Sequence, residues 1–201
     1  MAAGRNWLVN NEGQVQELTA APWTQPITPY RLYRFLSDLD DLLLKTSDDR
    51  DRLQFLCAMA RQLLSDSPWL QLAAESPDRD TGWSVSMLYD EPDYPITVQM
   101  VSWQAESQSP IHNHGTWGLV YLLAGCEKNR LWQRTEPTRD RIELTQDLVL
   151  EPGDILCFLP DAIHDVEALG TEETVSFNLY GETEGDRRFR FEPTTQTATS
   201  L

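Results

Sequence analysis

The chain has 201 residues, which is enough for one domain with its own hydrophobic core. Its 40% hydrophobic residues and seven tryptophans indicate a folded globular protein rather than a disordered chain. The formal net charge of −16 argues against nucleic acids and anionic membrane surfaces as partners, because both repel a strongly acidic protein.

The first part of the chain is expected to be irregular and then helical. Residues 1–27 contain two prolines and show no regular period. In residues 28–75, Thr28 is expected to be an N-cap and Pro29 the first residue of a helix, and a second helix is expected to begin near Asp48 and end at Ser67. The predicted buried faces repeat at helical spacing: Leu32, Phe35, Leu36, Leu39, Leu42 and Leu43, then Leu53, Leu56, Cys57, Ala60, Leu63 and Leu64.

Residues 82–192 change to a period of about two. Short runs rich in Val, Ile, Leu, Trp and Tyr alternate with Gly and Pro turns, a pattern typical of a β-barrel or sandwich. The basic run 187–190 lies among acidic residues and is expected to be a solvated edge. Residues 193–201 are expected to be a loose tail. The sequence thus predicts a single domain, 1–201, made of a β-barrel with helices packed outside it.

The three histidines of the chain form one constellation. His112 and His114 are two residues apart, so on a strand both imidazoles point to the same face. His164 follows a Pro-Gly turn, an apolar run and a second turn, which together predict a hairpin that brings it beside the first pair. We therefore expect one metal ion held by all three histidines. The alternative is an exposed pair on a strand face, which leaves the context of His164 unexplained.

The motifs around these histidines resemble those of a known family. PIHNHGTWGLVYLLAG resembles the first cupin motif and EPGDILCFLPDAIHDV the second. Gly118 stands where most cupins have a glutamate ligand. This form resembles the cysteine dioxygenase family, which includes bacterial cysteine and 3-mercaptopropionate dioxygenases, over residues 82–192. The resemblance implies a mainly β fold, the cupin double-stranded β-helix (a jelly-roll barrel) with N-terminal α-helices outside.

The resemblance also implies a cofactor and a reaction. Three neutral ligands leave positions on the metal open to a thiolate and dioxygen. The reaction between these two requires a redox-active metal, so Fe(II) is expected rather than zinc, with one ion per chain. The alternative is that the purified protein holds zinc or nickel. The expected function is oxidation of a small thiol, such as cysteine or a related mercapto compound, to the sulfinate with O2. The alternatives are a cupin metalloenzyme of other chemistry (a carbon-substrate dioxygenase, isomerase or lyase) and a non-catalytic cupin that binds a small ligand.

Ser176, Asn178 and Tyr180 alternate along one predicted strand and are expected to share a face. In the cysteine dioxygenase family this strand carries a Ser-x-His-x-Tyr array, so Asn178 replaces a histidine and cannot titrate. The resemblance implies that these three residues are catalytic, with Tyr180 donating a hydrogen bond to bound oxygen or thiolate. The alternative for Tyr180 is a buried hydroxyl bonded to Ser176 or Asn178.

The substrate-binding residues are less clearly indicated. The family holds its substrate carboxylate with an arginine, and the matching position here is Ser86. Arg130 is expected to supply that positive charge from another wall of the barrel, and the alternative is that it is an exposed arginine on a strand. Trp117 is expected to line the substrate pocket, and the alternative is that it packs in the core.

The remaining expectations concern cell compartment and assembly. There is no apolar stretch long enough for a membrane helix or a signal peptide, and the three cysteines form no CxxC pair. We therefore expect a cytoplasmic protein, a monomer or weak homo-oligomer, whose partners are a small thiol and O2 and include neither nucleic acid nor membrane.

Overall fold

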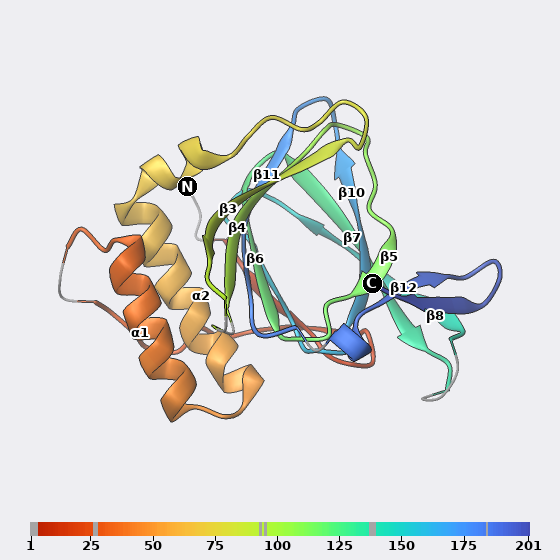
Figure 1. Cartoon of the computed structure of the whole chain (residues 1–201), viewed down its shortest axis with the longest axis horizontal. Coiled ribbons are helices and arrows are strands. Elements are labelled where there is room, and N and C mark those ends of the chain that lie inside the picture. Colours follow the sequence, from red (N-terminus) through yellow and green to blue (C-terminus); the bar gives the residue numbers. More distant parts are fainter. Residues whose placement is uncertain (1–3, 26–27, 93, 95, 137–139, 184) are drawn as a thin grey trace.

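The computed structural model describes residues 4–25, 28–92, 94, 96–136, 140–183 and 185–201. Two β-sheets face each other as an open barrel, and two α-helices lie against the outside of one sheet (Figure 1). The strands are β1 (Asn6–Val9), β2 (Val15–Glu17), β3 (Trp83–Asp90), β4 (Thr97–Trp103), β5 (Ile111–Asn113), β6 (Gly118–Ala124), β7 (Cys126–Arg134), β8 (Ile142–Leu150), β9 (Ile155–Phe158), β10 (Ile163–Leu169), β11 (Thr174–Tyr180), β12 (Phe189–Glu192) and β13 (Thr197–Ser200). The helices are α1 (Leu32–Lys45), α2 (Asp49–Asp66) and the 3-10 helices η1 (Pro68–Ala73) and η2 (Gly185–Arg187).

The strand order is that of a jelly roll. One sheet has the order β2-β1-β9-β6-β11-β4-β3 and the other the order β13-β12-β5-β10-β7-β8. The chain alternates between the sheets from β4 to β7 and again from β8 to β11, and the last of these strands pairs antiparallel with the first. This pairing of two Greek keys is the double-stranded β-helix. The predicted fold class, a cupin-type barrel with N-terminal helices outside, is confirmed.

The alternation along the strands separates the cavity from the main core. On β11, Val175, Phe177 and Leu179 face the helices and belong to or pack against the large apolar cluster, in which Phe177 is fully buried. The rings of Phe35 on α1 and Phe177 pack in an edge-on arrangement, with 6.3 Å between their centroids. The intervening polar residues of β11 therefore face the inside of the barrel, as their period predicts.

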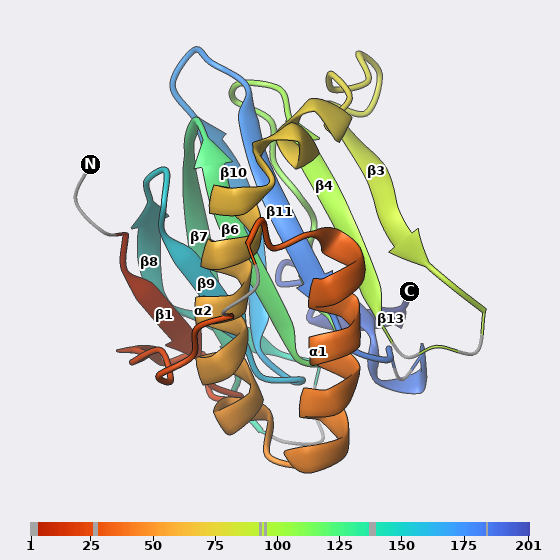
Figure 2. The same cartoon turned by 90° about the vertical axis from the view of Figure 1, so that its left-hand side faces the viewer.

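The two helices lie side by side across the outer face of the seven-stranded sheet (Figure 2). As predicted, α2 begins next to Asp48 and ends before Ser67. Asp48 is its N-cap, because the carboxylate accepts a hydrogen bond from the backbone N–H of Asp51 at 3.0 Å. The predicted start of the first helix is wrong, because α1 begins at Leu32 and its N-cap is Arg31 rather than Thr28. In the described part of the chain, no helix combines the length and apolarity needed to cross a bilayer.

Both ends of the chain are more regular than their composition predicts. Residues 1–27 were expected to be irregular, yet β1 pairs in parallel with β9 and antiparallel with β2, so this prediction is wrong for Asn6–Val9 and Val15–Glu17. Residues 1–3 and 26–27 lie outside the described part. The loose tail expected over 193–201 is also wrong at Thr197–Ser200, which pairs with β12 as a hairpin at the edge of the six-stranded sheet.

Candidate metal centre

The three imidazoles converge inside the barrel, as the sequence predicts. His112 on β5 lies directly opposite His164 on β10, and His114 follows one residue after β5. The ring centroids are 4.7–5.1 Å apart, and one ligand nitrogen from each ring lies within 4.8 Å of the others. The Nε2 atoms of His114 and His164 are 3.0 Å apart. Three imidazole nitrogens therefore meet at one point, from two paired strands.

Hydrogen bonds on the outer side of two rings fix their tautomers. The Nδ1 of His112 lies 2.9 Å from the backbone oxygen of Pro110, which can only accept, so this nitrogen carries the proton. The Nδ1 of His164 lies 2.9 Å from Oδ1 of Asn129 and donates in the same way. Each of these rings then directs the lone pair of Nε2 to the point of convergence, as a metal ligand must.

Burial keeps the cluster neutral. It lowers the pKa of His112, and lowers the pKa values of His114 and His164 well below the usual histidine value, because a charged ring inside the barrel loses its hydration. The mutual repulsion of the rings lowers the pKa values of His114 and His164 further. Neutral imidazole is the form that binds a metal.

Tyr180 occupies the position from which a fourth side-chain ligand would come. Gly118 on β6 is paired with Tyr180 on β11, and the phenol ring stacks on His114 with 4.6 Å between centroids. A Cβ at position 118 would lie 2.7 Å from Cδ1 of this ring. Any residue larger than glycine would therefore displace Tyr180, so a carboxylate side chain at position 118 and this position of the Tyr180 ring exclude each other.

The expected array on β11 is formed. The Nδ2 of Asn178 donates to Oγ of Ser176 at 2.9 Å, and the hydroxyl of Tyr180 donates to Oδ1 of Asn178 at 3.2 Å. Burial raises the pKa of Tyr180, and the negative charge of Glu127 raises it further, so the phenol stays protonated at neutral pH. The hydroxyl is therefore a hydrogen-bond donor, and its catalytic role stays a prediction.

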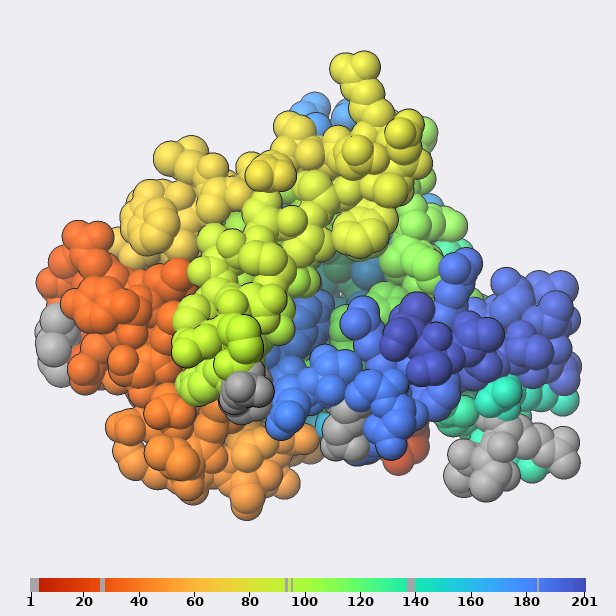
Figure 3. All heavy atoms as spheres, in the orientation of Figure 1, coloured from red at the N-terminus to blue at the C-terminus, as the bar shows by residue number. Residues whose placement is uncertain are grey.

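These residues line a cavity of about 490 Å³ that opens between the edges of the two sheets. Figure 3 shows the hollow between the yellow-green β3–β4 segment and the blue C-terminal segment. Trp83 and Trp103 form part of its wall, with their rings 6.0 Å apart. The lining residues also include Thr97, Gln99, Val101, Val120, Glu127, Val166, Arg188 and Arg190.

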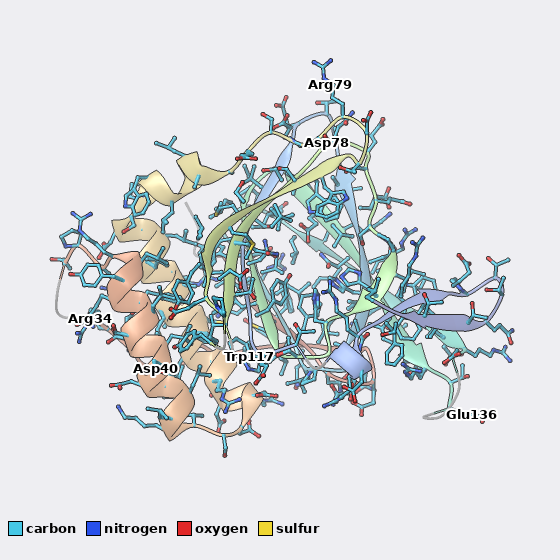
Figure 4. All side chains as sticks on the ribbon, viewed as in Figure 1. Arg34, Asp40, Asp78, Arg79, Trp117 and Glu136 are labelled. Atoms are coloured by element: carbon cyan, nitrogen blue, oxygen red, sulfur yellow. The ribbon has the colours of Figure 1, made fainter. Side chains whose placement is uncertain are left out.

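Both residues expected to bind substrate lie elsewhere. Arg130 does not line the cavity, because alternation on β7 turns it away from the side that Asn129 occupies, and its guanidinium pairs with Asp165 at 2.6 Å. Trp117 is 5% exposed and packs in the apolar core, and Figure 4 places it at the barrel wall near the helices. These two expectations are corrected.

Two arginines of the run expected to be a solvated edge, Arg188 and Arg190, are exposed as predicted and in addition line the cavity. Arg190 lies opposite His112 in the pairing of β12 with β5, and both arginines are exposed. Burial is the main cause of the lowered pKa values of His112 and His114, and the positive charge of Arg188 adds to it. Two guanidinium groups therefore line the cavity although the chain as a whole is strongly acidic.

The sequence analysis also missed Glu127 and Asn129 on the inner face of β7. Glu127 is 2% exposed and accepts a hydrogen bond from Nδ2 of Asn129 at 2.8 Å, while Asn129 also holds His164. Burial raises the pKa of Glu127 to about 7, against a smaller lowering by Asn129. The signal was present, because the period of two places residues 127, 129 and 131 on one face and Lys128 and Arg130 on the other.

No protein-family model matches the chain. Among solved structures, an oxalate oxidase in complex with the substrate analogue glycolate is 13% identical with a TM-score of 0.45, and the match covers 54% of this chain and 55% of that one. This chain thus spans about half the length of the oxalate oxidase. A cupin superfamily protein from Desulfitobacterium hafniense DCB-2 has 13% identity and a TM-score of 0.44, covering 57% and 88% of the two chains. A protein with a double-stranded β-helix domain from Klebsiella pneumoniae subsp. pneumoniae MGH 78578 has the same identity and TM-score, covering 57% and 83%. The chemistry of the site is inferred from the residues of this chain alone.

Proposed function

We propose that the protein is a mononuclear non-haem iron dioxygenase that oxidises a small thiol to the sulfinate with O2. The observation that carries this proposal is the convergence of three neutral imidazoles beside Tyr180, which stands where a carboxylate ligand would otherwise enter. Both oxygen atoms of O2 are added to sulfur, so a thiol and O2 balance a sulfinic acid without any other reductant.

The residues fit a divalent transition metal. Metal–imidazole bonds are about 2.1 Å long, so ligand nitrogens on one face of a metal lie about 3 Å apart. The Nε2 atoms of His114 and His164 are at this spacing, and the proton on Nδ1 of His164 leaves its Nε2 free. His112 completes the set. Iron, when bound, supplies the one-electron chemistry that lets a thiol and dioxygen react, which zinc lacks.

The protein's own residues supply orientation and a water-poor site. Tyr180 stacks on His114, and its protonated hydroxyl donates to Oδ1 of Asn178. Because the hydroxyl has a single proton, it donates to an oxygen or sulfur atom beside the ligand cluster only when it exchanges this partner for the substrate. Asn178 is in turn held by Ser176. Val120 and Val166 on opposite walls, with Trp103, keep much of the cavity apolar, which strengthens each hydrogen bond made there.

The cations at the mouth favour an anionic substrate. Arg188 and Arg190 are exposed at the cavity opening and present guanidinium groups, which bind carboxylates in a bidentate manner. We propose that they take the part that the sequence analysis gave to Arg130, attracting a thiol that carries a carboxylate or is itself ionised. A cavity of about 490 Å³ admits a small molecule of this kind.

The test is oxygen consumption by iron-loaded protein with a thiol panel. Protein is loaded anaerobically with Fe(II) and mixed with O2 and cysteine, 3-mercaptopropionate or cysteamine, and the sulfinate is identified by mass spectrometry. We expect one thiol to consume O2 and yield one sulfinate per O2. His164→Ala, loaded in the same way, is the control and is expected to show no uptake above background.

Absence of thiol-dependent oxygen uptake from protein that holds stoichiometric iron would refute the proposal. The metal content of protein purified without added metal is a second test of the proposed function. Stoichiometric zinc or nickel without iron would indicate a non-redox metalloenzyme, such as an isomerase or lyase, in which Glu127 is the candidate proton acceptor because its pKa of about 7 lies near the working pH.

A further inference from the structure

Glu127 lines the cavity, and no ion pair joins it to a cationic side chain among the described residues. It lies on the inner face of β7, away from the sheet edges that form the mouth, and it is 2% exposed. Its hydrogen-bond partner among the described residues is the neutral amide of Asn129. Carboxylates are rarely buried unless they are paired, because losing hydration costs several kcal/mol.

The neighbouring cations face the other way. Lys128 forms an ion pair with Glu167, and Arg130 pairs with Asp165, both through the opposite face of the strand pair β7–β10. The pKa of Glu127 is set by burial and by the Asn129 bond, with no contribution from a positive charge. At pH 8 the group is ionised, and the positive charge that would balance it is not supplied by the described residues.

Among the described residues, Asn129 is the side chain that donates a hydrogen bond to this carboxylate, although the lining of the cavity also includes the donors Gln99 and Tyr180. The side chains of Val101, Val120 and Val166 are apolar, and Asn178 donates to Ser176. The carboxylate oxygen that Asn129 does not engage is therefore available to a ligand. A ligand group that donates hydrogen bonds and carries a positive charge matches it best.

We infer that Glu127 is the subsite for the amine of the substrate, so that the thiol is an aminothiol bound with its ammonium group toward the inner wall. This rests on the proposed function for the identity of the thiol, while the preference for an amine is carried by Glu127 itself. The arginines at the mouth then lie on the opposite side of the cavity from the ammonium group, so the site discriminates between the two ends of a dipolar ligand.

The test is binding without turnover. Zinc-loaded protein, which cannot carry out the oxidation, is titrated in a calorimeter at pH 8 without oxygen. The probes are cysteamine and 2-mercaptoethanol, which differ in having an ammonium or a hydroxyl group at the same position. Cysteamine also has the more acidic thiol, which favours it at the metal in every variant. We therefore expect the ratio of cysteamine affinity to 2-mercaptoethanol affinity to be at least about tenfold higher in wild type than in Glu127→Gln, as a charge-assisted hydrogen bond provides.

Glu127→Gln is expected to keep only the preference that comes from thiol acidity, and Glu127→Asp to keep part of the additional preference. Glu167→Gln is the matched control, because it removes a carboxylate from the opposite face of the same strand pair, and it should keep the full preference. Circular dichroism verifies that each variant is folded.

Equal binding of the two thiols by wild type, or the same ratio of affinities in wild type and folded Glu127→Gln, would overturn the inference. The first of these outcomes is decisive even where the variant fails to fold. The outcome is independent of the proposed oxidation. Oxygen uptake without an amine preference would leave the dioxygenase and remove the subsite, whereas an amine preference without oxygen uptake would leave the subsite and remove the dioxygenase.

Discussion

Replacing Glu127 by glutamine should change how the stability of the metal-free protein depends on pH. Burial raises the pKa of Glu127 from 4.5 to about 7 in the folded protein, while in the unfolded chain the ordinary value applies. Below about pH 4.5 the group is protonated in both states and contributes nothing. Above pH 7 it is ionised in both states, and the folded state bears the cost of a buried charge.

The magnitude follows from the two pKa values. Each pKa unit corresponds to about 1.4 kcal/mol, so the full cost of the ionised Glu127 is about 3 kcal/mol. About 2 kcal/mol of it develops between pH 5.5 and pH 8. The lower limit of this range stays above the sequence pI of about 4.4, where the protein loses its net charge. Relative to wild type, Glu127→Gln should therefore gain about 2 kcal/mol of unfolding free energy over this range.

The assay is urea unfolding followed by tryptophan fluorescence at several pH values for wild type and Glu127→Gln. The three histidines also titrate, but they are common to both proteins and cancel in the difference. Glu167→Gln is again the control: the ion pair with Lys128 lowers the pKa of Glu167, so this group is ionised in both states throughout and its difference should be flat. A flat difference for Glu127→Gln as well would refute the reasoning that burial raises its pKa.

Two further substitutions probe the metal centre and its packing. Asn129→Ala removes the acceptor that orients His164 and should lower the metal affinity about 10–100-fold, measured by competition with a chromophoric chelator. Asn178→Ala is the control and should leave the metal affinity unchanged. Equal losses of affinity in the two variants would contradict the assigned contacts. Gly118→Ala places a Cβ 2.7 Å from the Tyr180 ring and should lower the unfolding free energy by about 1–3 kcal/mol in urea. Adding Tyr180→Ala should relieve most of that loss, and a purely additive double variant would show that the clash is not its cause.

The cluster of three histidines could be predicted because much of it follows from local geometry. A spacing of two residues places His112 and His114 near one point on any strand, and His164 lies beside them because β10 pairs with β5. The hairpin predicted before His164 is wrong, because β9 and β10 lie in different sheets. The polar face of β11 followed from the same alternation. These features depend on residues close in sequence, so the period of the side chains decides them.

The ends of the chain could not be predicted in this way. β1 is four residues long and is stabilised by pairing with β9, about 150 residues later. Its composition alone gives little signal, because the energy of a short strand comes from its neighbours. The hairpin of β12 and β13 was missed for the same reason: Thr197–Ser200 has good strand-forming residues but was interpreted from its polarity.

The error over Arg130 had a different cause, because the period on β7 was available but was not applied. Arg130 was predicted to bind the substrate carboxylate on the basis of its charge alone. Glu127 was not predicted in the site, where an acidic residue is seldom buried. Once the register places Asn129 beside His164, the same alternation puts Glu127 inside and Arg130 outside. One fixed residue on a strand thus determines the direction of all the others.

This register also explains how an acidic residue can coexist with a neutral ligand set. The carboxylate of Glu127 lies two hydrogen bonds away from the Nδ1 of His164, with the amide of Asn129 between them. Asn129 donates to Glu127 and accepts from His164, so ionisation of Glu127 polarises the amide and makes its oxygen a better acceptor. If a metal is bound, His164 would then be a stronger ligand for it, without a carboxylate in the coordination sphere. A cationic substrate group at Glu127 would reduce this polarisation, so amine binding and the ligand strength of His164 are coupled through Asn129.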